Sequence, residues 1–143
     1  MTPFEHIHEL RVRYAETDAM GVVWHGNYFA YFESARTEAL RNTGLPSYRE
    51  LEAAGIMMPV VEAGVSFFTP ARYDDLLRVR VRVAEPPRAR MRFDYEVACG
   101  GAAVAGGFTV LAFMDARTRR PCRPPGAFLA FFSGQPECSP PTP

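Results

Sequence analysis

The segment from Asn27 to Thr43 has the pattern of one long helix, and it constrains the fold more than any other stretch. Its apolar residues recur every three or four positions, which places them on one helix face. Gly44 is expected to cap the helix in a left-handed conformation, with Pro46 just beyond. The apolar helix face comprises Tyr28, Phe32, Ala35 and Ala39, flanked by Phe29, Arg36 and Leu40. A face this broad must be buried against another layer.

Strands supply that layer. Residues 76–84, LLRVRVRVA, alternate strictly, so one face is apolar and the other carries arginines. We also predict strands over residues 5–14, 57–68, 90–97 and 102–115. The last four strands are joined by short connections, so they are expected to pair antiparallel as a meander.

The economical way to bury the helix is to curl this sheet around it, which is an α+β arrangement. The 143 residues suffice for one domain. We place it at residues 1–132, followed by a Pro-rich, disordered tail at 133–143. A second short helix is expected over 47–54, capped by Ser47 and Glu50. The apolar stretch 126–132 is expected to dock as a short helix or strand.

Two details of side-chain placement follow from the same patterns. In the first strand, Ile7 and Leu10 are expected to face the core and His6 and His8 the polar side. Two such histidines could bind a metal at a strand edge, but solvated histidines are the favoured interpretation. On the long helix, Glu33 lies three residues before Arg36, at a spacing that allows the two to pair.

Composition excludes several classes of function. Sixteen basic residues balance sixteen acidic ones, which argues against nucleic acid as the main partner. No run of about 20 apolar residues exists, so no membrane span is expected. The N-terminal sequence lacks a signal-peptide pattern. The three cysteines contain no CxxC pair and lie far from the histidines, so we expect no metal site, reduced thiols and a cytoplasmic protein.

The segment Tyr14–Tyr28, YAETDAMGVVWHGNY, combines an acid, an apolar run and a histidine ahead of the helix. By residue type alone, Asp18 is more often a turn residue than a catalyst. However, the apolar run suggests a loop that lines a pocket, and His25 lies where backbone N–H groups at a helix start are unpaired. Such groups stabilise an oxyanion, and Gly26 would allow close approach to the backbone. A carboxylate opposite them could act as a nucleophile or as a general base.

The block 11–44, RVRYAETDAMGVVWHGNYFAYFESARTEALRNTG, resembles the hotdog-fold acyl-CoA thioesterases of the 4-hydroxybenzoyl-CoA thioesterase-like family, including the branch linked to the Tol-Pal system. The likeness continues through 55–81, GIMMPVVEAGVSFFTPARYDDLLRVRV. It implies a hotdog fold, with a long central helix wrapped by a curved antiparallel sheet. It also implies hydrolysis of short-chain or aromatic acyl-CoA without a metal or redox cofactor. A homodimer or homotetramer with active sites at subunit interfaces is expected.

The resemblance also implies roles for individual residues. Asp18 corresponds to the catalytic carboxylate, and His25 to the position whose backbone N–H faces the thioester carbonyl. Arg88 and Arg90 are candidates to hold the nucleotide phosphates, although for any single arginine a solvated outer sheet face is the favoured interpretation. Ser66 and Thr69 are candidates to contact the pantetheine or the acyl group. The surrounding loop corresponds to Tyr14, Gly21, Val22, Val23, Trp24, Gly26 and Asn27.

Two alternatives remain. A hotdog dehydratase would need its histidine and carboxylate in a different helix-and-loop context. A non-catalytic module that binds acyl-CoA or acyl-carrier protein would keep the pocket without turnover, and the presence of Asp18 argues against it. The paired side chains Met57-Met58 and Phe67-Phe68 are expected in the core or at an interface that shapes the acyl pocket.

Overall fold

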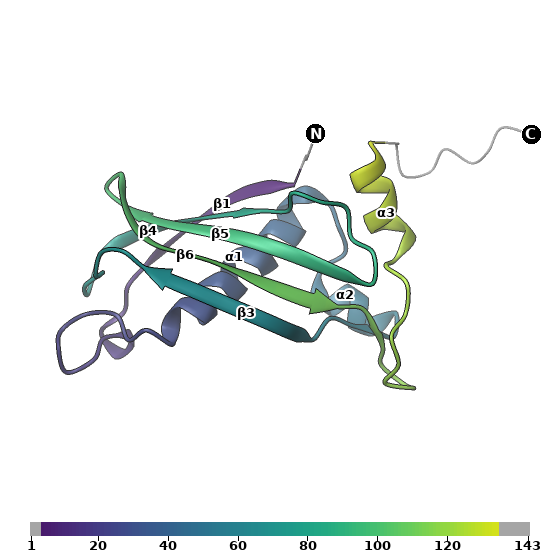
Figure 1. Ribbon diagram of the computed structural model, residues 1–143, viewed down its shortest axis with the longest axis horizontal. Coiled ribbons are helices and arrows are strands. Elements are labelled where there is room, and N and C mark those ends of the chain that lie inside the picture. The colour runs from purple at the N-terminus through teal and green to yellow at the C-terminus, as the bar shows by residue number, and fades with distance from the viewer. Residues whose placement is uncertain (1–3, 135–143) are drawn as a thin grey trace, which may run out of the picture.

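The computed structural model, which describes residues 4–134, packs one long helix against one five-stranded sheet (Figure 1). The strand order is β1-β4-β5-β6-β3, and each neighbouring pair is antiparallel. Helix α1 (Asn27–Thr43) runs across one face of this sheet. The predicted α+β class is confirmed. The strands are β1 (Glu5–Arg11), β3 (Val60–Phe67), β4 (Leu76–Arg82), β5 (Arg90–Cys99) and β6 (Ala102–Ala112).

Shorter elements complete the described chain. Strands β2 (Ile56–Met57) and β7 (Met114–Asp115) pair as a small separate ladder. The predicted strands 57–68 and 102–115 are therefore each interrupted, the first at Pro59, which has no N–H to donate to a ladder. The remaining elements are the 3-10 turn η1 (Tyr14–Glu16) and the helices α2 (Tyr48–Ala53) and α3 (Gly126–Ser133).

The predicted helix boundaries are confirmed. Gly44 ends α1 with φ of 82°, in the left-handed region. Ser47 and Glu50 cap α2 reciprocally: the Glu50 N–H donates to Ser47 Oγ at 3.2 Å, and the Ser47 N–H donates to Glu50 Oε1 at 3.1 Å. The stretch 126–132 docks as the helix α3, which buries Phe128 and Phe132. The predicted tail lies outside the described residues from position 135 onward.

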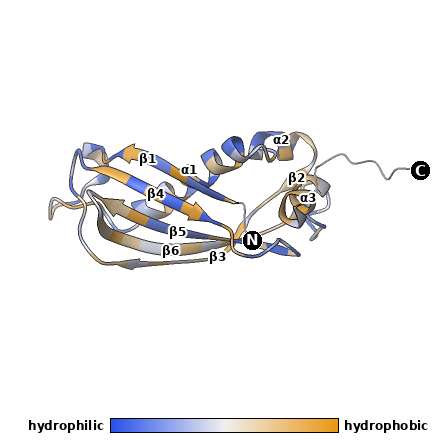
Figure 2. Cartoon of the chain, turned by 90° about the horizontal axis from the view of Figure 1, so that it is seen from above, coloured by the Kyte–Doolittle hydropathy of each residue, from blue (hydrophilic) through white to orange (hydrophobic). Residues whose placement is uncertain are grey.

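The core forms where the apolar face of α1 meets the inner face of the sheet. Phe32 is fully buried and stacks on Tyr95 of β5, with ring centroids 4.2 Å apart. Gly107 of β6 makes room for it, because a Cβ there would lie 2.8 Å from the Phe32 ring and 2.3 Å from the Gly64 carbonyl. Figure 2 shows the predicted alternation of hydrophobic and hydrophilic residues along β4.

The predicted order of the strands was wrong in one respect. β3 does not pair with β4, the next strand in sequence. Instead it pairs with β6 at one edge of the sheet, while β4 pairs with β1 near the other edge. The segment 68–75 therefore crosses from one side of the sheet to the other. As a result β1 occupies one edge of the sheet beside β4, and β3 occupies the other edge, where no further described strand pairs with it.

The predicted face of β1 was wrong for His6, Ile7 and His8, whereas Leu10 packs against the core as predicted. His6 and His8 are half-buried on the side of the strand that faces the helix, and Ile7 is 45% exposed on the outer side. The shift between Ile7 and Leu10 explains the error, since only one of them can share a face with Val12, which is buried. Burial and the neighbouring His8 lower the pKa of His6, and Glu38 of α1 partly offsets them.

Replacing Gly107 by alanine should destabilise the fold by about 1–3 kcal/mol, because the added methyl group overpacks the Phe32 contact. Urea denaturation followed by circular dichroism would measure the change. Gly106→Ala is the matched control, since its Cβ would find only ordinary contacts, 3.5 Å or more away. Equal effects of the two substitutions would contradict this account of how α1 approaches the sheet.

Candidate active site

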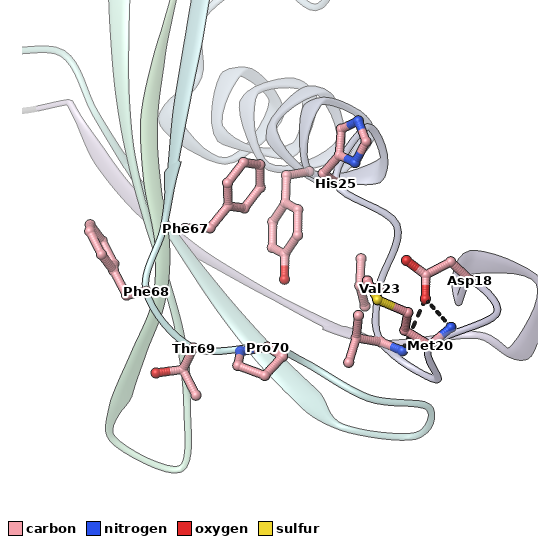
Figure 3. A pocket seen from close by; sticks show the side chains of 10 residues that line it. Asp18, Met20, Val23, His25, Phe67, Phe68, Thr69 and Pro70 are labelled. Atoms are coloured by element: carbon pink, nitrogen blue, oxygen red, sulfur yellow. Dashed lines mark hydrogen bonds between the residues drawn. The ribbon is translucent and has the colours of Figure 1, made fainter.

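A cavity of about 260 Å³ lies where the loop before α1 meets the end of β3 (Figure 3). Three segments that are distant in sequence form its wall: the loop from Asp18 to His25, the first turn of α1, and the residues that follow β3. Five of the residues predicted for the site line this cavity: Asp18, Val22, Val23, His25 and Thr69. The other lining residues are Met20, Tyr28, Phe67, Phe68 and Pro70.

Asp18 serves the turn and also lines the cavity. Its Oδ1 accepts hydrogen bonds from the backbone N–H groups of Met20, at 2.9 Å, and Val22, at 3.4 Å (Figure 3). Among the described residues, no group donates a hydrogen bond to Oδ2. The side chain is half-buried. The turn interpretation and the catalytic one are therefore compatible, because one oxygen holds the loop and the other remains available.

The start of α1 presents unpaired backbone donors beside the same cavity. The Asn27 N–H donates to the Trp24 carbonyl at 2.9 Å, and the Tyr28 N–H donates to the His25 carbonyl at 3.4 Å. Within residues 4–134, the N–H groups of His25 and Gly26 have no such acceptor. These two donors lie at the positive end of the helix. The expected unpaired N–H groups are thus at positions 25 and 26, and not at Asn27.

Glu16 holds the loop against α1, a role that sequence reasoning missed. Its carboxylate accepts hydrogen bonds from the Arg13 N–H at 2.8 Å, from Arg13 Nε at 3.0 Å and from the Tyr31 hydroxyl at 2.9 Å. Its backbone carbonyl accepts from the Trp24 N–H and from the Asn27 side chain. The spacing of Arg13 and Glu16 was the available signal, since a glutamate three residues after a capping position is typical of a helix start.

Several of the predicted loop residues build the loop without lining the cavity. Gly21 adopts φ of 80°, which closes the turn after Asp18. Tyr14 is exposed and contacts the ring of Tyr73. Gly26 does not make room for a ligand as predicted: the Trp24 ring occupies the space, and a Cβ at Gly26 would lie 2.3 Å from it.

The aromatic residues of the cavity were only partly anticipated. Phe67 and Phe68 are 50% and 63% exposed, so they do not belong to the core. Figure 3 shows Phe67 on the cavity side of β3 and Phe68 across the strand. The Phe67 ring packs edge-on against Tyr28, at 5.4 Å between centroids, and against His25, at 6.4 Å. Burial raises the pKa of the Tyr28 phenol, so it faces the cavity as a neutral hydroxyl.

The remaining predicted contacts lie away from this cavity within one chain. Arg90 begins β5 opposite Ala112, near the start of β3, whereas the cavity is at the end of β3. Arg88 lies just before Arg90 in the preceding turn. Ser66 is exposed and pairs with Gly106 in the sheet, but it does not contribute to the cavity wall.

The described residues contain neither a metal-binding cluster nor a membrane-spanning helix. No group of three or more His, Cys, Asp or Glu residues is arranged to hold a metal ion there. No helix in the same part of the chain is both long and apolar enough to span a membrane.

Comparison with known proteins identifies the family. The model of the thioesterase-like superfamily matches residues 12–132, which include the whole cavity and nearly all of the described fold. The chain belongs to the thioesterase-like superfamily. The predicted enzyme class, a thioesterase, is confirmed at the level of this family, as is the expected hotdog fold.

Individual relatives agree with this assignment. The acyl-CoA thioesterase YbgC of Haemophilus influenzae is 38% identical over 85 residues, which span 59% of this chain and 62% of that protein. The crystal structure of TT1821 from Thermus thermophilus is 40% identical and superposes with a TM-score of 0.83, covering 90% of this chain and 97% of the other. A DHNA-CoA thioesterase from Staphylococcus aureus is 35% identical, with a TM-score of 0.80, and the match covers 83% and 80% of the two chains. Such relatives support thioester hydrolysis as the general activity.

The loop should loosen at acid pH because of Glu16. Burial opposes its charge, but hydrogen bonds from Arg13 and Tyr31 outweigh burial and lower the pKa of Glu16. A lowered pKa means that the stabilisation is complete above the ordinary glutamate value, about 4.3, and is lost as the pH falls through the value in the folded chain. We therefore expect Glu16→Gln to cost about 1–3 kcal/mol at neutral pH, and less with increasing acidity.

Urea denaturation of both proteins between neutral and acid pH would measure this difference. Glu50→Gln is the control, since Glu50 closes the corresponding capping box of α2 on an exposed surface. A Glu16→Gln effect that stays constant with pH would contradict the role of the carboxylate charge.

Proposed function

We propose that this protein hydrolyses the thioester bond of short-chain or aromatic acyl-CoA, with Asp18 as the catalytic carboxylate. One observation carries the proposal. A carboxylate with an unused oxygen and a helix start with an unused N–H donor at His25 border the same largely apolar cavity. A thioester carbonyl needs an attacking or base-activated oxygen on one side and a stabiliser for its developing negative charge on the other.

The proposed reaction uses the two parts together. The carbonyl oxygen lies against the unused N–H group of His25, at the positive end of α1, which receives the charge that develops on it. Asp18 Oδ2 either attacks the carbonyl carbon to form a mixed anhydride, or takes a proton from a water molecule that attacks. The thiolate of coenzyme A then leaves, and water provides the oxygen of the released acid. The acyl group lies among Phe67, Tyr28 and Val23, whose side chains make that part of the cavity apolar.

Asp18→Asn separates catalysis from loop structure. The asparagine keeps an Oδ1 acceptor for the N–H groups of Met20 and Val22, so the turn should persist, while the negative charge is lost. We expect a fall in kcat of about 100-fold or more in a thiol-release assay on a panel of short-chain and aromatic acyl-CoA esters.

Asp115→Asn is the matched control, because Asp115 Oδ1 also accepts two backbone N–H bonds in a turn, those of Arg117 and Thr118, and lies outside the cavity. This variant should retain full activity. An Asp18→Asn enzyme with normal turnover would overturn the assignment. Binding of acyl-CoA without turnover by the unmodified protein would instead favour the non-catalytic binding module.

We further propose that two copies associate through the free edge of β3. An unpaired edge strand exposes backbone donors and acceptors, and here it also exposes apolar side chains, including Val60, Val61 and Phe67. Antiparallel pairing would set the Phe67 end of one β3 beside the Val60 end of the other. The partner's β5 would then bring its Arg88 and Arg90 to the same end as the cavity, within reach of the phosphates of coenzyme A.

Val61→Lys should weaken this association, since a lysine on an edge strand opposes further pairing. Size-exclusion chromatography with light scattering would measure the mass against that of the 16.0 kDa chain. Ile7→Lys is the control: Ile7 has the same exposed fraction, 45%, on the strand at the opposite edge. The proposal fails if the unmodified protein is monomeric, or if only the Ile7 substitution dissociates it.

A further inference from the structure

A second cavity, of about 360 Å³, lies at the other end of β3, between α1, α2 and the β2–β3 connection. It is separate from the cavity at Asp18 and shares no lining residue with it. Its wall consists of Glu33, Arg36, Thr37, Tyr48, Glu52, Ile56, Met57, Met58, Pro59 and Val60.

Arg36 is the unusual member of this wall. Its side chain projects from the apolar face of α1 and the residue is only 5% exposed. The predicted pair with Glu33 does not form. Instead, Arg36 donates to three hydroxyl groups: from Nε to Tyr48 at 2.6 Å, and from Nη1 to Tyr95 at 3.1 Å and to Thr109 at 3.5 Å.

No carboxylate within residues 4–134 forms an ion pair with this guanidinium, although Glu33 and Glu52 line the same cavity. Burial raises the pKa of Tyr48 to about 12 and also raises that of Tyr95, so both phenols are neutral at physiological pH. Burial also opposes the Arg36 charge, yet the Tyr95 and Tyr48 oxygens outweigh it and keep the pKa of Arg36 high. A buried charge without a partner is costly, and is usually paired in proteins.

One nitrogen of the guanidinium remains available to a ligand. Nε and Nη1 make the hydrogen bonds described above, whereas Nη2 donates to no described residue. Since no described side-chain nitrogen or oxygen is both buried and unpaired, Nη2 must retain some contact with solvent. Arg36 lines the second cavity, so this is where Nη2 can meet a ligand.

We propose that the second cavity binds a monocarboxylate with a small apolar body, whose carboxylate accepts a hydrogen bond from Arg36 Nη2. The charge and planar geometry of the guanidinium suit a carboxylate. The side chains of Ile56, Met57 and Met58 form an apolar wall for the rest of the ligand. The carboxylates of Glu33 and Glu52 on the same wall disfavour anions of higher charge, such as phosphates.

Methionine methyl groups report the two cavities separately. Met57 and Met58 line the Arg36 cavity, and Met20 lines the Asp18 cavity. In protein labelled with ¹³C at the methionine methyl groups, benzoate should produce saturable shifts of the Met57 and Met58 signals in NMR spectra. Benzamide, which has nearly the same shape but no charge, should not. An equal response to both compounds, or a benzoate response confined to Met20, would overturn the proposal.

Variants test the assignment to Arg36. Arg36→Met removes the positive charge together with the hydrogen bonds to Tyr48, Tyr95 and Thr109, so circular dichroism must first establish that the variant folds. The affinity of the folded variant for benzoate should fall by at least about tenfold. Glu33→Gln and Glu52→Gln each remove a repelling charge and should raise the affinity by about two- to fivefold. An unchanged affinity in both glutamine variants would reject the site even if Arg36→Met did not fold.

The test is independent of catalysis. Benzoate binding at Met57 and Met58 should be the same in the Asp18→Asn variant, because Asp18 contributes nothing to this cavity. A failure of the carboxylate site would therefore leave the proposed hydrolysis untouched. Conversely, a protein without thioesterase turnover should still bind benzoate beside Arg36.

Discussion

The contact between α1 and the inner face of the sheet is the interaction on which the rest of the structure depends. The helix closes on the sheet because Phe32 stacks on Tyr95 in the space that Gly107 leaves open. That contact fixes the position of the helix start, and hence of the N–H groups of His25 and Gly26. Glu16 then joins the preceding loop to the helix, because its carboxylate accepts hydrogen bonds from Tyr31 of α1 and from Arg13 before the loop. A loop joined to the fold only through its own backbone would not hold Asp18 beside a particular helix end.

Asp18 shows how one side chain can meet two demands. Oδ1 holds the turn through two backbone N–H groups, so the orientation of the carboxylate is set before any ligand binds. The same two hydrogen bonds also fix the orientation of Oδ2, which itself accepts no hydrogen bond from a described residue. Preorganisation of this kind matters for catalysis, because a charge that is already oriented does not have to be ordered during the reaction. The statistical preference of aspartate for turns is therefore no argument against catalysis at this position.

Local patterns predicted the helices and the alternation of β4, because each depends on neighbours in sequence. The length of α1, its Gly44 cap and the Ser47–Glu50 capping box are examples. The errors concern choices between distant partners. Short connections suggested that β3 and β4 pair, but the sheet instead places β1 beside β4 and leaves β3 at an edge. The face of β1 was ambiguous because Ile7 and Leu10 differ in phase, and only the packed helix decides between them.

Arg36 and Glu16 show that the partners of polar side chains are equally hard to predict from sequence when those partners are distant along the chain. Both lie at spacings that indicate a local ion pair or cap, and the spacing was informative only for Glu16, which does pair with Arg13. Arg36 turns away from Glu33 because its place on the helix directs it inward, where Tyr48, Tyr95 and Thr109 come from three separate elements or turns of the chain. Sequence spacing cannot bring such partners together, since they meet only once the sheet has closed on the helix. The charge that results is hydrogen-bonded to neutral hydroxyl groups and forms no ion pair within the described residues, and a carboxylate in the adjoining cavity would provide a direct partner for it.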